Sequence, residues 1–379
     1  MGRKNIVILL AFGGVCILLS FVWRNSKVDD QPFSSAQISR HPESHHTSQR
    51  QIRLKNRKNQ YHRQTIFQSK SQSIYSKEVE ADRQQFAILQ ERLARLNEHC
   101  KLFQSPDKKR DVARHPPDTL IVNEEHRIIY CNVPKVGCTN WKSVLLKLAG
   151  FDKINISALH TMGTNTKGKI YLDYLHRYPN ISHRRFMLQN YTKFFFVRHP
   201  FTRILSAFRN KIAPKTSYYF RNKGQEAERW LSRYGSQIIE KYRGKAEANR
   251  VSSNWNKEYD LTFSEFIRFL VDPFTDSYNK HWSDIHSMCL PCDIDYDVIG
   301  KYETINEDAD YILRLLNVDP GITFPTPNPL TMTNSSSGKL VDKYYKEVPK
   351  LYLYQLAKLY DVDFELFGYD PVPFLNINN

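Results

Sequence analysis

The chain has 379 residues, of which 41% are hydrophobic and 13% aromatic, enough for a sizeable core and for one or two domains. A chain that is disordered along its whole length is thereby excluded. The 55 lysine and arginine residues outnumber the 39 acidic ones, for a formal net charge of +16. The surface therefore attracts polyanions, which include nucleic acid, acidic polysaccharide, anionic membrane and nucleotide cosubstrates.

The N-terminus carries a candidate membrane anchor. Ile6 to Trp23 form a run of about 18 residues without a charge, long enough to span a thin bilayer. Arg3 and Lys4 precede it, and such a positive flank favours the cytosol. We therefore expect residues 1–5 to be a cytosolic tail, residues 6–23 a single-pass type II anchor, and the rest of the chain lumenal. A cleaved signal peptide is the alternative, but the run exceeds the usual length of such a segment and no small-residue cleavage site follows it.

A lumenal chain is open to N-glycosylation and to disulfide formation. Four acceptor sequons occur, at Asn155, Asn180, Asn190 and Asn334. Five cysteines follow the anchor, namely Cys100, Cys131, Cys138, Cys289 and Cys292. Because five is odd, at least one cysteine stays free or pairs between chains. The last two form a lone CxxC, which is weak evidence for zinc, so structural disulfides of unassigned connectivity are favoured.

Residues 24–117 are predicted to be a lumenal stem. From Arg24 to about Ser76 the sequence is polar, so it offers too little apolar surface to offset the entropy of ordering. The next segment, EVEADRQQFAILQERLARLNEHC, has an apolar stripe at helical spacing, made by Phe86, Leu89, Leu93 and Leu96. This stripe either pairs two stems in a homodimer or packs on the folded domain.

Residues 118–379 are predicted to be the folded domain, of class α/β. TLIVNEEHRIIYCNV contains two β-rich runs separated by a polar turn, and a helix follows from Asn140 to Leu148. Lys193 to Val197 have the composition of a buried strand, with helical periodicity from Phe201 onward. Strand, loop and helix thus occur twice in succession. This order predicts a three-layer domain with a central, mainly parallel sheet and with ligands at the carboxyl ends of its strands.

The remaining sequence is mostly helical in pattern and contains no internal repeat. The expected elements are a helix over Glu226 to Tyr242, a helix opened by the capping box Thr262-Phe-Ser-Glu265, a short strand in YDVIGKYE, a helix over Asn306 to Leu316, a loop from Pro320 to Ser337 and a final helix towards Tyr360.

The loop PKVGCTNWK, between the second β-rich run and the helix, has the residues of an anion site. Lys135 precedes Gly137. Thr139 and Asn140 stand at the helix start, where hydroxyl, amide and backbone N–H groups can surround a tetrahedral anion. The loop lacks the GxxxxGK[ST] pattern of a Walker loop, so an ATPase is disfavoured. An ordinary helix cap beside an exposed lysine is the alternative.

A second loop strengthens the interpretation as an anion site. Arg198 follows the strand Lys193 to Val197, and Ser206 lies about two helical turns later, so both can reach an anion above the sheet edge. Arginine offers a planar fork for a phosphate, and serine offers a hydroxyl donor. Alone, VRHP would equally fit a salt bridge beside a turn proline. Two such units in one domain indicate a ligand with two anionic groups.

At these residues the sequence resembles the Golgi carbohydrate sulfotransferases, specifically the branch with the chondroitin, dermatan and N-glycan GalNAc-4-O-sulfotransferases and the natural killer epitope sulfotransferase. VPKVGCTNWK looks like that family's 5′-phosphosulfate loop, and VRHPFTRILSAFRNK looks like its 3′-phosphate site. The resemblance extends to CLPCDIDYDVIGKYE and the type II anchor, and it covers about Asp118 to the C-terminus. His199 is a departure, because many relatives carry an acidic residue there.

The resemblance implies a P-loop-like sulfotransferase fold in the Golgi lumen, a membrane anchor, and a donor, 3′-phosphoadenosine 5′-phosphosulfate (PAPS), used without a metal. It implies that Arg198 and Ser206 hold the 3′-phosphate. It implies that Lys135 acts as an electrophilic catalyst, which stabilises the charge that develops on the leaving phosphate. The 5′-phosphosulfate would be held by the first loop, which consists of Pro134, Lys135, Val136, Gly137, Cys138, Thr139, Asn140 and Trp141.

An acceptor hydroxyl needs a base within hydrogen-bond reach. His160, in SALHTMG after the first helix, is the first candidate, because related sulfotransferases place a histidine or glutamate near that stage of the fold. A surface histidine is the alternative interpretation. His281 and His286 are the runners-up. Their HxxxxH spacing does not put both side chains on one helical face, so a zinc site is disfavoured.

The expected reaction is sulfation of a sugar hydroxyl on a proteoglycan or glycoprotein glycan, with no nucleic acid involved. The preferred acceptor is the 4-hydroxyl of GalNAc in chondroitin or dermatan or on N-glycans, and the 3-hydroxyl of terminal glucuronic acid is the alternative. A non-catalytic, lectin-like membrane protein that binds polyanions is a second alternative. A glycosyltransferase is disfavoured, because it would need an acidic metal-binding pair such as DxD, and the DID at Asp293 to Asp295 directly follows the CxxC.

Overall fold

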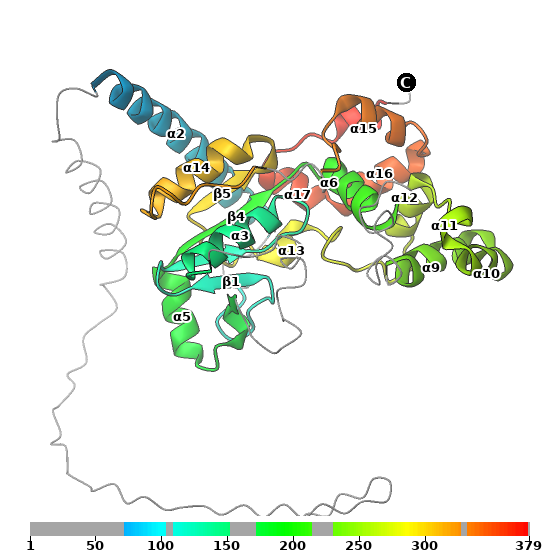
Figure 1. The fold of residues 1–379 in the computed structure, drawn as a ribbon, viewed down its shortest axis with the longest axis horizontal. Helices are drawn as coiled ribbons and strands as arrows, with labels where there is room; N and C mark the ends of the chain where they lie inside the picture. The colour runs from blue at the N-terminus through cyan, green and yellow to red at the C-terminus, as the bar shows by residue number, and fades with distance from the viewer. Residues whose placement is uncertain (1–71, 104–108, 152–171, 214–229, 327–331, 378–379) are drawn as a thin grey trace, which may run out of the picture. The chain divides into compact units, whose positions relative to one another are not determined.

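One compact unit runs from Ser71 to Asn379 (Figure 1). The expected tail, the anchor, Asn155 and His160 lie outside the residues that the structure describes. Within the described residues, no helix has the length and apolar character needed to cross a bilayer. This computed structural model describes residues 72–103, 109–151, 172–213, 230–326 and 332–377.

A five-stranded sheet forms the centre of the unit, in the order β3-β1-β2-β4-β5. Strands β2, β4 and β5 pair in parallel, whereas β1 pairs antiparallel with both β2 and β3. The expectation of a mainly parallel sheet is therefore corrected to a mixed sheet. The connection between β1 and β2 is too short for a crossover, so these strands form a hairpin. The strands are β1 (Leu120–Asn123), β2 (Ile128–Cys131), β3 (Asp173–Tyr174), β4 (Thr192–Val197) and β5 (Val298–Lys301).

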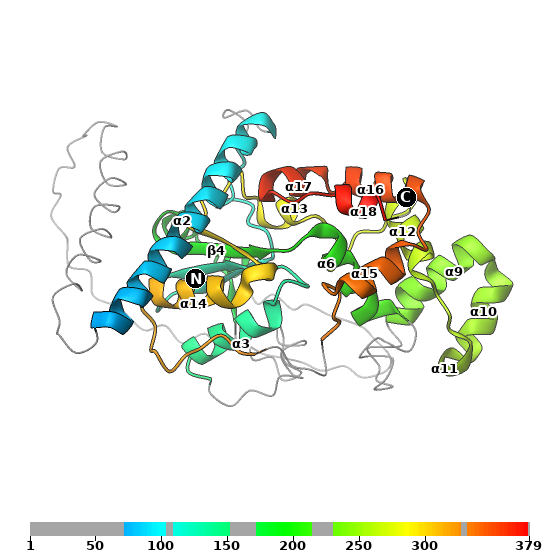
Figure 2. The ribbon, with the colours of Figure 1, turned by 90° about the horizontal axis from the view of Figure 1, so that it is seen from above.

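Strand β4 carries the apolar run that predicted a buried strand, and residues 194–197 are fully buried. A strand that is apolar on both faces needs cover on both faces. Helix α3 (Cys138–Leu148) lies on one side of β4, and α13 (Ile285–Cys289) and α17 (Asp361–Phe367) lie on the other (Figure 2). Helices therefore cover both faces of the sheet at β4, as the expected three layers require.

Each parallel strand is followed by a loop and a helix. β2 leads into α3, and β4 leads into α6 (Pro200–Ala207). β5 leads through the short 3₁₀ helix η6 (Tyr302–Thr304) into α14 (Ile305–Leu315). These elements confirm the predicted helices after both loops and the predicted strand in YDVIGKYE. Because the carboxyl ends of parallel strands share one sheet edge, the three loops meet there.

A second part of the unit is wholly helical and has its own core, rich in aromatic side chains such as Phe208 and Phe266. The predicted capping box is present, because Thr262 Oγ1 accepts the Glu265 N–H at 3.2 Å and Glu265 Oε2 accepts the Thr262 N–H at 2.9 Å. Its elements are η4 (Phe208–Ile212), η5 (Leu231–Gly235), α9 (Ser236–Arg243), α10 (Lys245–Ser253), α11 (Trp255–Glu258), α12 (Phe263–Val271), α15 (Gly338–Tyr345), α16 (Lys350–Leu359) and α18 (Val372–Leu375).

Helix α2 (Gln72–Phe103) lies among the residues expected to be stem, yet it packs against the folded domain (Figure 2). Leu89 and Leu96 are 1% and 2% exposed and belong to the same core as the sheet. Arg92 forms an ion pair of 2.7 Å with the buried carboxylate of Asp308. Of the two interpretations of the apolar stripe, packing on the domain accounts for these two leucines.

Two disulfides join distant parts of the domain, Cys100–Cys292 and Cys131–Cys289. The two cysteines of the CxxC therefore pair with a cysteine of α2 and with the last residue of β2. Cys138, the first residue of α3, is the free cysteine among the described residues. The preference for structural disulfides over half a zinc site is confirmed.

Candidate active site

The loops after β2 and β4 meet at the carboxyl edge of the sheet. The first loop turns sharply, because Lys135 has φ +74° and Gly137 has φ +86°, both in the left-handed region. Glycine is required at position 137, since a Cβ there would lie 2.4 Å from Ile305 Cδ1 at the start of α14. The chain then enters α3 without a side-chain cap. This helix end is therefore open to a ligand.

Arg198, the residue after β4, joins the two loops. It is 3% exposed, and its Nη1 donates to the backbone carbonyl of Lys135 at 3.1 Å. Its Nη2 donates to the hydroxyls of Ser335 and Ser336 at 3.0 and 2.8 Å. The guanidinium also lies over the Tyr302 ring, 4.1 Å from its centroid. Arg198 thus holds the segments after β2, after β5 and before α15 around a single positive charge.

The segment before α15 supplies hydroxyls that the sequence analysis did not identify. Ser206 Oγ lies 3.1 Å from Thr333 Oγ1, which in turn lies 2.7 Å from Ser335 Oγ. Arg209 Nε donates to the carbonyl of Thr333 at 2.8 Å. The structure therefore brings Ser206 and Arg198 to one row of hydroxyl groups. The available sequence signal was the hydroxyl-rich run TNSSSG, which falls in the predicted loop.

Arg203, in α6, is a second buried cation that the sequence analysis missed. It is 1% exposed, and its guanidinium donates to the carbonyls of Pro134, Ser283 and Lys280 at 3.1, 2.6 and 2.9 Å. All three acceptors are neutral backbone groups. Arg203 therefore binds the first loop to the segment that carries His281, and it adds a positive charge to the interior of the site.

Positive charges gather around Lys135. Burial and repulsion by Lys211, Arg198 and Arg203 lower the pKa of Lys135 to about 7, against an opposing effect of Cys138. Among the described residues, Lys135 Nζ has no hydrogen-bond or ion-pair partner. An anion bound here would offset the repulsion and favour the protonated amine, so the charge distribution fits an anionic ligand.

The other residues predicted in the first loop divide into two groups. Val136 and Trp141 are fully buried in the core, so their side chains support the loop by packing. Asn140 Nδ2 donates to the carbonyl of Pro325 at 2.7 Å, which joins the start of α3 to the segment after α14. The half-buried members of the loop are Pro134, Lys135, Gly137, Cys138, Thr139 and Asn140.

His199 caps helix α6. Its Nδ1 accepts the Phe201 N–H at 3.2 Å, and its Nε2 donates to the carbonyl of Asp370 at 3.0 Å. This pattern is that of a neutral ring with its proton on Nε2. Burial lowers the pKa of His199, so the neutral form is favoured. The ring nitrogen thereby does what a carboxylate oxygen does at a helix N-cap.

One candidate base, His281, is connected to this site. Its Nδ1 lies 2.7 Å from Asn279 Oδ1, an amide oxygen that accepts the bond from the ring. The ring of His281 lies 4.9 Å from that of Trp230, which is 4.8 Å from Lys211 Nζ. Lys211 is in turn the charged neighbour with the largest effect on Lys135. The Trp230 ring thus contacts both His281 and Lys211, and it connects the candidate base to the lysine that most strongly affects Lys135.

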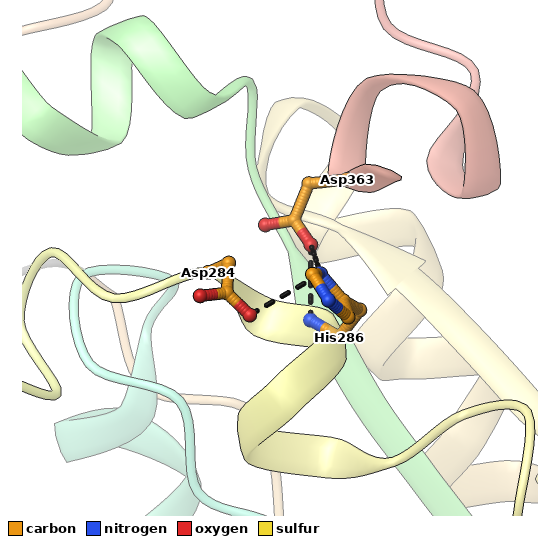
Figure 3. A group of neighbouring side chains, drawn as sticks. All are labelled: Asp284, His286 and Asp363. Atoms are coloured by element: carbon orange, nitrogen blue, oxygen red, sulfur yellow. Dashed lines mark hydrogen bonds and ion pairs between the residues drawn. The ribbon is translucent and has the colours of Figure 1, made fainter. Parts of the chain in front are cut away.

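His286 belongs to a different arrangement, with Asp284 and Asp363 (Figure 3). Its Nδ1 lies 3.1 Å from Asp363 Oδ1 and 3.2 Å from Asp284 Oδ2. Asp363 also accepts the backbone N–H groups of His286 and Ile285, at 2.9 and 2.7 Å. The three ligand atoms lie within 4.8 Å of one another, near enough for a metal ion. Each already makes hydrogen bonds that order α13, and those of Asp363 hold α13 to α17, which accounts for the arrangement.

The three described sequons are exposed but differ in their surroundings. Asn180 caps α5 (Ile181–Asn190) by accepting the His183 N–H at 3.1 Å, and Asn190 is the last residue of that helix. Asn334 lies in the segment whose hydroxyls contact Arg198. A glycan on Asn334 would therefore stand beside the candidate active site.

The DxD-like pair contacts another part of the chain. Asp293 Oδ1 accepts the Arg110 N–H at 2.9 Å, and Asp295 lies 3.9 Å from Lys109 Nζ. These contacts hold the segment after α2 next to the CxxC. The pair thus has a structural explanation.

Comparisons with known proteins agree with this geometry. The model of the sulfotransferase family matches residues 118–370. Carbohydrate sulfotransferase 11 of Rattus norvegicus is 35% identical over 300 residues, which cover 77% of this chain and 79% of the relative. Carbohydrate sulfotransferase 14 of Danio rerio is 38% identical over 274 residues, which cover 71% and 65%. Carbohydrate sulfotransferase 12 of Mus musculus is 34% identical over 273 residues, which cover 68% and 62%. No solved structure gave a significant match. The chain belongs to the sulfotransferase family, a family that uses PAPS as its sulfate donor, and it is an enzyme of the carbohydrate-sulfating kind.

Proposed function

We propose that this enzyme transfers the sulfuryl group of PAPS to the 4-hydroxyl of GalNAc, in chondroitin or dermatan or on N-glycans. The observation that carries the proposal is the bond from Arg198 to the carbonyl of Lys135, which unites the two anion-binding loops. A donor with anionic groups at both ends needs two such loops at a defined spacing. A lectin that binds polyanions does not.

In the proposed complex, Arg198 and Ser206 hold the 3′-phosphate, together with the hydroxyls of Ser335 and Ser336. Those hydroxyls already bond to Arg198, and a hydroxyl can rotate towards a phosphate oxygen without a change of backbone. Lys135 and the open end of α3 hold the 5′-phosphosulfate. Thr139 and Asn140 take part there, and Asn140 would exchange its bond to a backbone carbonyl for one to the ligand.

At sulfur, the reaction forms one bond and breaks one bond. The acceptor oxygen attacks sulfur, and the bond between sulfur and the bridging oxygen of the 5′-phosphate breaks. The proton of the acceptor goes to a base, and the products are a sulfate ester and 3′-phosphoadenosine 5′-phosphate. Negative charge grows on the bridging oxygen, where the ammonium group of Lys135 stabilises it.

We propose His160 as the base, with His281 and His286 as alternatives. His281 is favoured over His286 by its surroundings. Against the effect of burial, two carboxylates raise the pKa of His286 and favour its protonated form, which cannot accept a proton, whereas Nδ1 of His281 bonds to a neutral amide oxygen. The pH–rate profile of each His→Ala variant tests the assignment, because only loss of the true base removes the acidic limb.

We also propose that the enzyme is a type II Golgi membrane protein with residues 1–5 in the cytosol and residues 6–23 as its anchor. Two features support a lumenal domain. The relatives are carbohydrate sulfotransferases, and two disulfides join distant parts of the domain. Disulfides of this structural kind persist in oxidising compartments.

The test is incubation of the full chain with radiolabelled donor and a panel of acceptors. The panel holds desulfated chondroitin, desulfated dermatan, GalNAc-terminated oligosaccharides and glucuronyl-lactosamine. Label at the 4-position of GalNAc supports the proposal, and the Lys135→Ala variant should then lose turnover while Lys245→Ala, in α10, keeps it. Label at the 3-position of glucuronic acid would favour the alternative acceptor. Donor binding without label in any acceptor would contradict the proposed acceptor, and no donor binding would favour the lectin-like module.

A further inference from the structure

A cavity of about 430 Å³ lies in the helical part of the unit, between the segment that opens α9 and the segment after α12. Its lining includes Arg233, Tyr234, Lys241, Phe274 and Tyr278. We call it the outer pocket. None of these residues belongs to the two anion-binding loops, so the proposed donor site leaves the pocket without a role.

Two aromatic rings of the outer pocket are left in solvent by folding. Phe274 is 90% exposed and Tyr278 is 63% exposed. An isolated exposed ring is common on protein surfaces, but two at one cavity form an apolar patch that a ligand can cover. The carbon-bound hydrogens of a sugar ring are apolar on their faces and pack well against aromatic rings, while the sugar hydroxyls stay in water.

The lining of the outer pocket carries the cations Arg233 and Lys241 and the carboxylate of Asp276. The guanidinium of Arg233 lies 5.4 Å from the centroid of the Tyr234 ring, and no carboxylate of the described residues forms an ion pair with it. Lys241 is paired with Asp272 at 3.1 Å, and Asp276 receives the Tyr278 N–H. Arg233 is therefore the group of the pocket that is suited to a carboxylate, which a guanidinium binds with two parallel hydrogen bonds.

The outer pocket is joined to the active site by shared aromatic side chains. The ring of Tyr234 stacks on that of Trp230, with centroids 5.6 Å apart. Trp230 contacts both Lys211 and His281, at 4.8 and 4.9 Å. Tyr234 and Trp230 thus connect the pocket to Lys211, the lysine whose charge most strongly affects Lys135. An acceptor that extends beyond the pocket past Trp230 would approach the proposed active site, whereas a single terminal sugar would be too short to reach both the pocket and the site.

We infer that the outer pocket binds the acceptor some sugar units away from the reacting hydroxyl, and that it selects a uronate-bearing polysaccharide. Arg233 binds a uronate carboxylate, and Phe274 and Tyr278 pack against sugar rings. This inference rests on the proposed function, and it deepens it, because it assigns the enzyme to acidic polymers such as chondroitin rather than to neutral, GalNAc-terminated N-glycans.

The test compares Arg233→Gln and Phe274→Ala with the unchanged chain, on desulfated chondroitin polymer and on a GalNAc-terminated trisaccharide without uronate. For the polymer, KM should rise about five-fold in Arg233→Gln and about three-fold in Phe274→Ala, with kcat nearly unchanged. For the trisaccharide, KM should not change. Arg268→Gln serves as the matched control, because Arg268 is an exposed arginine of α12 that does not line the pocket.

Three results would overturn the inference: an unchanged KM for the polymer, an equal rise for both acceptors, or an equal effect of the control variant. Direct binding separates this inference from the proposed reaction. Calorimetry with desulfated chondroitin oligosaccharides and no donor should show weaker binding to Arg233→Gln, and the difference should shrink with added salt. If binding changes but no acceptor is sulfated, the reaction is wrong and the pocket stands. If sulfation occurs but binding does not change, the pocket is wrong and the reaction stands.

Discussion

Arg198 donates a hydrogen bond of 3.1 Å to the backbone carbonyl of Lys135, across the edge between two neighbouring parallel strands. The bond places the cation of one loop against the backbone of the other. Because Arg198 is 3% exposed, water competes little for it. The geometry of the proposed donor site is therefore set by a contact between the loops, which gives the individual substitutions below definite expected outcomes.

Replacement of Arg198 by lysine should weaken donor binding by about 100-fold, equivalent to about 3 kcal/mol. A lysine keeps the charge but cannot form parallel bonds with a phosphate or hold the hydroxyls of Ser335 and Ser336 at the same time. Calorimetric titration with 3′-phosphoadenosine 5′-phosphate measures the effect. Arg268→Lys is the control. Near-normal affinity in Arg198→Lys, with an intact thermal transition, would contradict the assignment of the 3′-phosphate to Arg198.

Donor affinity should fall as pH rises above about 7, because the pKa of Lys135 in the free enzyme is about 7. The protonated amine binds the anion, and each further pH unit removes up to about ten-fold in affinity, until pH reaches the higher pKa that the amine has in the complex. The measurement is the affinity for 3′-phosphoadenosine 5′-phosphate between pH 7 and pH 9. Lys135→Arg, whose charge persists, should have a flat profile. A slope that survives in this variant would assign the titration to another group.

Gly137→Ala should lower the free energy of unfolding by about 2–4 kcal/mol, since the added Cβ combines a left-handed φ of +86° with a clash against Ile305 Cδ1. Gly150→Ala separates the two effects. Gly150 has φ +80° with nothing within 4 Å of its Cβ position, so that variant should cost only about 1 kcal/mol. Urea unfolding measures both. In an Ile305→Val background, which lacks Cδ1, the cost of Gly137→Ala should shrink; a constant cost would refute the clash.

His286 should contribute stability at low pH that is lost as pH rises. Burial lowers the pKa of this ring, but the hydrogen bond and charge of Asp363, with Asp284, outweigh burial and raise the pKa above its usual value of 6.5. A raised folded-state pKa means that the contribution is complete below about pH 6.5 and disappears as pH passes the folded-state pKa. The free energy of unfolding of the unchanged chain minus that of His286→Gln, measured from pH 5.5 to pH 8.5, should therefore decrease. A difference that stays constant with pH would show that the ring is not protonated in the fold.

Local sequence patterns predicted the elements of the fold that depend on residues close together in the chain. The buried strand β4 was evident from a run of apolar residues, and the capping box from the spacing of Thr262 and Glu265. Both loops of the site were found because a strand, a basic residue and a helix start lie close together in the sequence. The structure brings Arg198 and Ser206 to the segment before α15, and their binding of a phosphate stays a prediction.

What the sequence analysis missed depends on contacts between distant segments. Arg203 looked like one of many basic residues in a helix, and its burial arises from carbonyls that lie 69 to 80 positions away along the chain. The mixed sheet was missed because a hairpin and a crossover both begin with the same apolar strand pattern. The role of α2 depends on its partners across the fold, which an apolar stripe alone does not identify.

The two disulfides join residues 192 and 158 positions apart. Synthesis delivers the N-terminal partners, Cys100 and Cys131, long before Cys289 and Cys292 exist. During that interval the nascent chain beyond Cys16 carries three thiols, those of Cys100, Cys131 and Cys138, which can join in wrong combinations. Correct assembly must therefore wait for the C-terminal third of the chain, and the folding yield should depend on an isomerase that reshuffles early bridges through thiol–disulfide exchange.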